Sequence, residues 1–140
     1  MNFEDVLAQD GRLVYKTFGA SMKPMLYPNR DLVSIIVPDG QLKKYDVALY
    51  TRGDRYVLHR VIGVRETIYL IRGDNTYTLE EVPFQNVIGV LESFVRNGKQ
   101  ISVKDRRYRI YVRIWNLLYP ARYIAIGFRR SMRKRRNMAE

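Results

Sequence analysis

A serine in a turn and a histidine in a strand are the residues of this chain that could together do chemistry. Ser21 stands in the stretch Gly19-Ala20-Ser21-Met22-Lys23-Pro24, between a glycine and a proline. A serine hydroxyl is a weak nucleophile at its own pKa and needs a hydrogen-bonded base. His59 is the chain's single histidine, and a neutral imidazole suits that task near neutral pH. The pair predicts acyl transfer, with Ser21 as nucleophile and His59 as base.

Two further groups would complete such a site. A carboxylate on the second ring nitrogen would fix the tautomer of His59 and stabilise the imidazolium. Asp74 ends the strand that is expected to pair with the His59 strand, so its carboxylate could reach the ring. The backbone N–H of Ser21 is the expected oxyanion donor. The competing interpretation is a lysine base, for which the candidates are Lys23, Lys43 and Lys44.

The composition removes several other kinds of site. The chain has no cysteine, which excludes disulfides, thiolate zinc sites and cysteine nucleophiles. One histidine excludes a histidine-rich metal site. We therefore expect no metal and no cofactor.

The elements that must position these residues are short strands. Apolar, β-branched runs separated by turn residues predict an all-β domain, either a barrel or a packed pair of sheets. Residues 78–85 are expected to be irregular around Pro83. A short helix is expected at 2–9, capped by Asn2, and strands at 12–18, 32–37, 46–51, 56–64, 67–72, 86–96 and 100–103.

The charge of the chain divides it in two. Of a formal net charge of +11 over 140 residues, residues 104–140 supply 12 basic side chains against 2 acidic ones. We expect a β domain over 1–103 and a basic amphipathic helical tail over 104–140, interrupted near Pro120. The tail predicts an anionic partner, and two interpretations of its apolar face stand side by side: contact with a membrane surface or packing against the β domain. Nucleic acid is a less favoured partner, because it would leave that face unused.

Targeting signals are not apparent in the sequence. Residues 1–10 lack the apolar core of a signal peptide, and no uncharged apolar run reaches the length of a spanning helix. The expected location is the cytoplasmic face of a membrane or its periphery.

Six sequence blocks, in order, resemble those of type I signal peptidases, over roughly residues 10–95. The blocks are Gly19-x-Ser21-Met22-x-Pro24, Arg30-Asp31-Leu32-Val33, Tyr45-Asp46-Val47-Ala48-Leu49-Tyr50, Leu58-His59-Arg60-Val61-Ile62-Gly63, Gly73-Asp74-Asn75 and Val87-Ile88-Gly89-Val90. Where bacterial enzymes and the related self-cleaving repressors have a lysine, this chain has His59, so it is similar to the endoplasmic-reticulum and archaeal type.

The resemblance implies a signal peptidase-like antiparallel β fold in which Ser21 attacks a peptide carbonyl. It implies Asp74 as the acid, but the family often has a second acid about six residues later, and Glu80 stands there. The choice between Asp74 and Glu80 is open. The family's membrane-spanning anchor has no counterpart in the sequence, and Gly19 offers no side-chain hydroxyl to an oxyanion.

The expected function is therefore that of a serine endopeptidase that cleaves a peptide or leader at or near a membrane. Two alternatives use the same fold without that activity. A catalytically silent module could hold an extended peptide along a strand edge. A self-cleaving regulatory domain is the other, although about ten residues before the first strand leave no room for an N-terminal DNA-binding domain.

Overall fold

The computed structural model describes residues 2–17 and 19–121 of the chain. It is a mainly β protein with a helix near each end of the described part. The elements in chain order are α1 (Phe3–Asp10), β1 (Arg12–Lys16), β2 (Leu32–Ile36), β3 (Val47–Arg52), β4 (Arg55–Val64), β5 (Ile68–Arg72), β6 (Glu80–Pro83), a 3-10 turn η1 (Phe84–Asn86), β7 (Val87–Arg96), β8 (Lys99–Ser102) and α2 (Arg106–Leu117).

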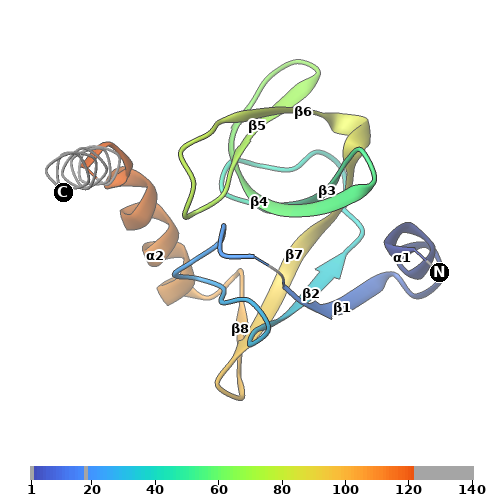
Figure 1. Ribbon diagram of the computed structural model, residues 1–140, viewed down its shortest axis with the longest axis horizontal. Helices are drawn as coiled ribbons and strands as arrows, with labels where there is room; N and C mark the ends of the chain where they lie inside the picture. The colour runs from blue at the N-terminus through green and yellow to red at the C-terminus, as the bar shows by residue number, and fades with distance from the viewer. Residues whose placement is uncertain (1, 18, 122–140) are drawn as a thin grey trace, which may run out of the picture.

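The eight strands form one antiparallel sheet. Its strand order is β1-β2-β7-β3-β4-β5-β6, and β8 pairs with the last residues of β7 on the edge opposite β2. β7 is long enough to join two regions: its first residues pair with β3, which leads into the curl of β3 to β6, and its later residues lie between β2 and β8 (Figure 1). The prediction of a mainly β, antiparallel domain is confirmed. The strands form a single open sheet with β1 and β6 at its ends, and not the barrel or packed pair of sheets that the sequence predicted.

The N-terminal helix begins and ends where its capping residues predict. The side chain of Asn2 accepts a hydrogen bond from the Asp5 N–H at 2.8 Å. Gly11 ends the helix in the left-handed conformation, with φ +70, which costs glycine little. Phe3 then stacks on Tyr56 of β4, with ring centroids 4.4 Å apart. The helix is thereby fixed to both the first strand and the fourth.

Two clusters of buried side chains lie on opposite sides of the sheet. The larger one includes Met25, Leu49, Phe94 and, from α2, Tyr108 and Val112. The smaller one lies inside the curl of β3 to β6 and is built from Leu42, Ala48, Tyr50, Val61, Tyr69, Ile71 and Val82. Because α2 contributes to the larger core, the described part of the basic segment packs against the β domain. The rest of the predicted tail, residues 122–140, lies outside the described residues.

One expectation about the strands is wrong. Residues 80–83, predicted to be irregular, form β6 and pair with β5, with Pro83 opposite Ile68. Proline is tolerated there because β6 is the last strand of the sheet and needs ladder hydrogen bonds on one side only. The strand matters to the site because it begins at Glu80.

Candidate active site

Ser21 lies in the turn that follows β1, on a partly exposed corner. Gly19 adopts φ +76, in the region that favours glycine, and lets the chain leave the strand sharply. Two methionines after the serine, Met22 and Met25, are buried in the core and anchor the turn from below. The hydroxyl of Ser21 is therefore carried by backbone that is held on both sides.

A second turn, at residues 73–76, clamps the serine turn. The Asn75 N–H donates to the Ser21 carbonyl at 2.8 Å, and the Asn75 side-chain amide donates to the Ala20 carbonyl at 3.0 Å. Gly73 sits so close that a Cβ there would lie 2.6 Å from the Ser21 carbonyl oxygen and 3.1 Å from His59 Nε2. No larger residue fits at 73 without moving the serine or the imidazole.

His59, in the middle of β4, faces the serine. Its Nε2 lies 2.9 Å from the Oγ of Ser21, within hydrogen-bond reach. The sequence places these residues 38 positions apart, and the sheet brings them together at the end of β1 and the centre of β4. This is the nucleophile–base contact that acyl transfer needs.

The other ring nitrogen of His59 meets a tyrosine. Nδ1 lies 3.4 Å from the hydroxyl of Tyr50, and that hydroxyl donates to the carboxylate of Glu80 at 2.6 Å. Since the Tyr50 proton goes to Glu80, the tyrosine oxygen is left as an acceptor for an Nδ1–H. This tautomer leaves the lone pair of Nε2 facing Ser21. Arg52 Nη2 donates to the same Glu80 oxygen at 3.0 Å and is the last group in this chain of hydrogen bonds.

The environment keeps the imidazole neutral. Burial, followed by the positive charge of Arg52, lowers the pKa of His59 to about 4, against the opposing pull of Glu80 and Asp74. Burial, together with the hydrogen bond to Glu80, raises the pKa of Tyr50 above its ordinary value, so the phenol keeps its proton. At neutral pH the histidine is a proton acceptor and the tyrosine a donor.

Asp74 pairs with an arginine. Its two carboxylate oxygens accept from the Arg60 guanidinium at 2.8 and 2.9 Å, and the Tyr111 hydroxyl donates to it at 3.1 Å. Arg60 is fully buried and also donates to the Tyr45 carbonyl and the Tyr108 hydroxyl. Burial alone would lower the pKa of Arg60, but Asp74 outweighs it and the pKa is raised. The contacts of Asp74 thus join β4, its own turn and α2.

Of the predicted residues, the structure brings Ser21 and His59 into contact. Of the two candidate acids, Glu80 is connected to His59 through Tyr50, and Asp74 contributes its charge to the imidazole while its oxygens bind Arg60. The sequence reasoning missed Tyr50, which reads as a core aromatic in a buried strand. Tyr50 could have been found only by combining the strand pairing with the side-chain alternation. Ala48 pairs with His59, and Tyr50, two residues along the same strand, lies on the same face of the sheet.

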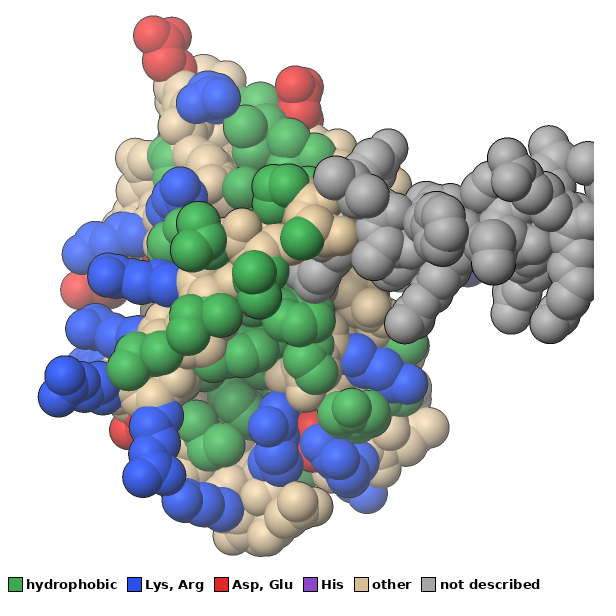
Figure 2. Space-filling model, turned by 90° about the vertical axis from the view of Figure 1, so that its left-hand side faces the viewer, with side chains coloured by type: hydrophobic (Ala, Val, Ile, Leu, Met, Phe, Trp, Pro, Cys, Tyr) green, Lys and Arg blue, Asp and Glu red, His purple; other side chains and the backbone are tan. Residues whose placement is uncertain are grey.

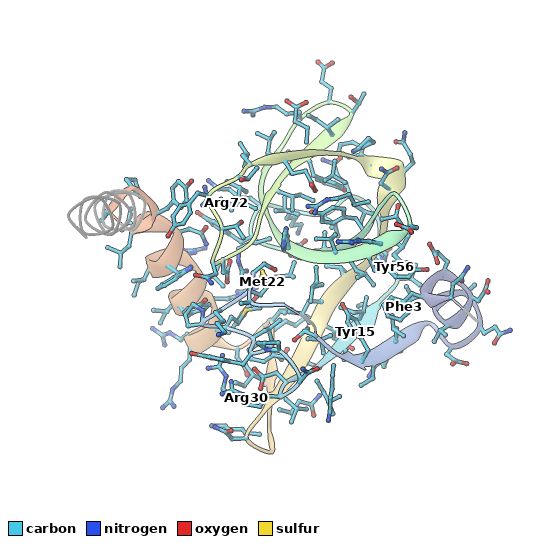
Figure 3. The ribbon with its side chains drawn as sticks, viewed as in Figure 1. Phe3, Tyr15, Met22, Arg30, Tyr56 and Arg72 are labelled. Carbon is cyan, nitrogen blue, oxygen red and sulfur yellow. The ribbon has the colours of Figure 1, made fainter. Side chains whose placement is uncertain are left out.

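A groove of about 570 Å³ opens beside the pair, and Ser21 and His59 line it. One wall comes from β1 and the residues after it, and the other from residues 55–59 of β4. Phe3, Tyr15 and Tyr56 lie together at the α1 end of this groove (Figure 3). β5 pairs with β4 only from Arg60 onward, so this half of β4 has β3 as its one strand partner among the described residues.

Comparison with known proteins adds no family assignment: no family model and no curated protein matches the chain. The resemblance to signal peptidases rests on the sequence blocks alone. Across residues 2–17 and 19–121, no group of three or more histidine or acidic side chains is arranged to hold a metal ion. No helix within that part of the chain is long and apolar enough to cross a membrane.

Proposed function

We propose that the protein is a serine endopeptidase with a signal peptidase-like catalytic sheet, in which Ser21 is the nucleophile and His59 the general base. The observation that carries the proposal is the 2.9 Å contact between Ser21 Oγ and His59 Nε2 in an open groove. The acid we assign is Glu80, acting through the Tyr50 hydroxyl.

The proposed reaction follows from where each proton can go. Ser21 Oγ attacks the carbonyl carbon of the scissile peptide as its proton passes to Nε2 of His59. The imidazolium then returns that proton to the leaving amine, the C–N bond breaks, and an acyl ester remains on Ser21. A water molecule gives its proton to His59 and attacks the ester, and the serine leaves with the proton that His59 returns. Tyr50 and Glu80 stabilise the imidazolium formed in both halves.

The oxyanion would be held by backbone. In the described part of the chain no hydrogen bond uses the Ser21 N–H, so this donor is available to a developing negative charge beside Oγ. Asn75 fixes the direction of the donor, because it holds the two carbonyl oxygens of the Ala20–Ser21 segment. The turn at 73–76 would therefore contribute to catalysis by positioning the Ser21 N–H.

An extended peptide is the substrate that the groove fits best. β1 ends the strand order, and residues 55–59 of β4 have no partner strand on their second side among the described residues. A chain entering between these two walls can hydrogen-bond to strand backbone and present a carbonyl to Ser21. Apolar side chains from Met22, Leu26 and Leu58 line the groove and favour apolar residues next to the cleaved bond.

Labelling with a fluorophosphonate tests the assignment without knowledge of the substrate. Intact-mass analysis at neutral pH should show one adduct on the wild-type chain and none on Ser21→Ala. Ser34→Ala is the matched control, because the Ser34 hydroxyl has no hydrogen-bond partner in the described structure and its loss should leave labelling unchanged. Folded wild-type protein that takes up no label, or labels at another serine, would overturn the proposal.

A further inference from the structure

The helix α2 has two different faces. Tyr108 and Val112 point into the larger core and are buried, whereas Ile110, Ile114 and Leu117 are 49%, 52% and 79% exposed. These three recur at spacings of four and three residues, which places them along one stripe of a helix. Leu118, which follows the helix, is 47% exposed and extends the stripe. Among the described residues, nothing covers this apolar stripe on the outside of the packed helix.

Arginines accompany this stripe. Arg106, Arg107, Arg109 and Arg113 are all exposed on the same helix, and none forms an ion pair with a described residue. Figure 2 looks onto the side of the molecule where α2 lies and shows a hydrophobic area with lysine and arginine side chains around it. The surface therefore combines apolar contact area with unneutralised positive charge.

Three kinds of partner could bind such a surface, and two of them would complement either its charge or its apolar stripe but not both. A nucleic acid would neutralise the arginines but leave the apolar stripe in water. A second copy of the chain would cover the stripe but bring arginines against arginines. A lipid interface with anionic headgroups takes up both, with apolar side chains at the acyl boundary and arginines at the phosphates.

We infer that the outer face of α2, formed by Ile110, Ile114, Leu117, Leu118 and the flanking arginines, docks on an anionic lipid surface. The inference is independent of catalysis, because the face is opposite the one that contacts the β domain. The inner face of the same helix holds the turn behind the serine, where Trp115 Nε1 donates to the Asp74 carbonyl at 2.8 Å. Docking would thus place the lipid surface against the helix that supports the turn behind Ser21.

Vesicle co-sedimentation of the full chain tests the inference. The wild type should bind vesicles of phosphatidylcholine with phosphatidylglycerol at least about tenfold more than vesicles of phosphatidylcholine alone, and salt should weaken binding. The double variant Ile114→Glu/Leu117→Glu should lose at least about tenfold in binding. The charge variant Arg109→Glu/Arg113→Glu should lose about as much.

Two control variants match these changes elsewhere on the surface. Val14→Glu/Val37→Glu alters two valines of the β domain that are 56% and 49% exposed, and Lys16→Glu/Lys99→Glu reverses two exposed lysines outside α2. Both controls should bind anionic vesicles within about threefold of the wild type. Circular dichroism should show all four variants folded, because every altered side chain is exposed.

Three results would overturn the inference. The first is vesicle binding that the Ile114→Glu/Leu117→Glu variant retains. The second is a dimer in light scattering that this variant abolishes, which would assign the stripe to a second copy. The third is tight binding of an oligonucleotide that depends on Arg109 and Arg113 without vesicle binding. Loss of fluorophosphonate labelling has no bearing on any of these outcomes, so failure of the proposed catalysis and failure of docking are distinguishable.

Discussion

The Oγ of Ser21 and the Nε2 of His59 lie 2.9 Å apart, each on a separate wall of one groove. The contact joins the turn after an end strand to the centre of β4, and the turn at 73–76 holds both partners in place. The proposed nucleophile needs a neutral base, and burial together with Arg52 lowers the pKa of His59 so that its imidazole is neutral.

Removing the proposed base, His59, should abolish reactivity and leave the fold intact. His59→Gln keeps a polar side chain of similar size but cannot accept and return a proton, so we expect fluorophosphonate labelling to slow by roughly 10³-fold or more. Lys23→Ala, which removes the lysine nearest in sequence to Ser21, should label at the wild-type rate. The rate of adduct formation, followed by mass spectrometry, measures both. Fast labelling of His59→Gln with slow labelling of Lys23→Ala would make the lysine the base.

Gly73→Ala should disable the site through one methyl group. The added Cβ would lie 2.6 Å from the Ser21 carbonyl oxygen and 3.1 Å from the His59 ring, so the serine turn or the imidazole must shift. We expect labelling to fall by roughly 10²-fold, the size of effect that a displacement of about 1 Å produces. Gly63→Ala is the matched control, because its Cβ would meet only the side chain of Leu70, at 3.3 Å. Equal labelling rates in both variants would contradict the close approach.

The two candidate acids should fail in different ways. Glu80→Gln weakens the link to His59 through Tyr50 and should reduce labelling by about tenfold or more, with a small change in stability because the side chain is partly exposed. Tyr50→Phe should reduce labelling similarly, since it removes the oxygen that faces Nδ1.

Asp74→Asn should act mainly on stability. It leaves the fully buried Arg60 without its counter-charge, which typically costs about 3–5 kcal/mol in the free energy of unfolding. Urea denaturation measures the loss. If Asp74→Asn is stable but no longer labels, and Glu80→Gln is fully active, then Asp74 and not Glu80 is the acid that orients His59.

The rate of fluorophosphonate labelling should fall only at low pH. Since the pKa of His59 is lowered to about 4, the labelling rate should be level from pH 7 down to about 5 and fall below about 4, as the base becomes protonated. A histidine at its ordinary pKa would lose activity from about pH 6.5, and a lysine base at higher pH still. Because the chain has one histidine, its ring signals in an NMR titration report this pKa directly.

The same shift links His59 to stability. Between about pH 4 and 6.5 the unfolded histidine binds a proton and the folded one does not, so the free energy of unfolding should rise with pH across this window. Acidification through it should destabilise the wild type more than His59→Gln, which has no group to titrate there. Chemical denaturation at several pH values checks the difference, and parallel pH profiles for the two proteins would contradict the lowered pKa.

Much of the fold could be predicted from local patterns. Alternating and β-branched runs predicted β1 to β5, β7 and β8, and the Asn97-Gly98 turn between the last two has both residues at positive φ, as such a hairpin requires. β6 was missed because four residues ending in Pro83 carry no strand signal of their own. Their pairing depends on the neighbouring β5, which is a tertiary effect.

The site was predictable where chemistry depends on residue type and unpredictable where it depends on packing. Ser21 and His59 were identified from their sequence blocks. Nothing in the sequence distinguishes Arg60, which is fully buried, from a solvent-exposed arginine. Its ion pair with the Asp74 carboxylate could therefore not be predicted. The role of Tyr50 depends in the same way on three strands meeting: β3 carries it, β4 carries His59 and β6 carries Glu80.

The buried pair of Arg60 and Asp74 also bears on how the protein is made. Two of its further hydrogen bonds come from Tyr108 and Tyr111 of α2, which the ribosome adds more than thirty residues after Asp74. Until that helix has emerged and docked, a charged guanidinium and its carboxylate lack two of their partners at the centre of the domain. The turn that holds Ser21 would then reach its final geometry only late in synthesis, after every residue of the candidate site had already been translated.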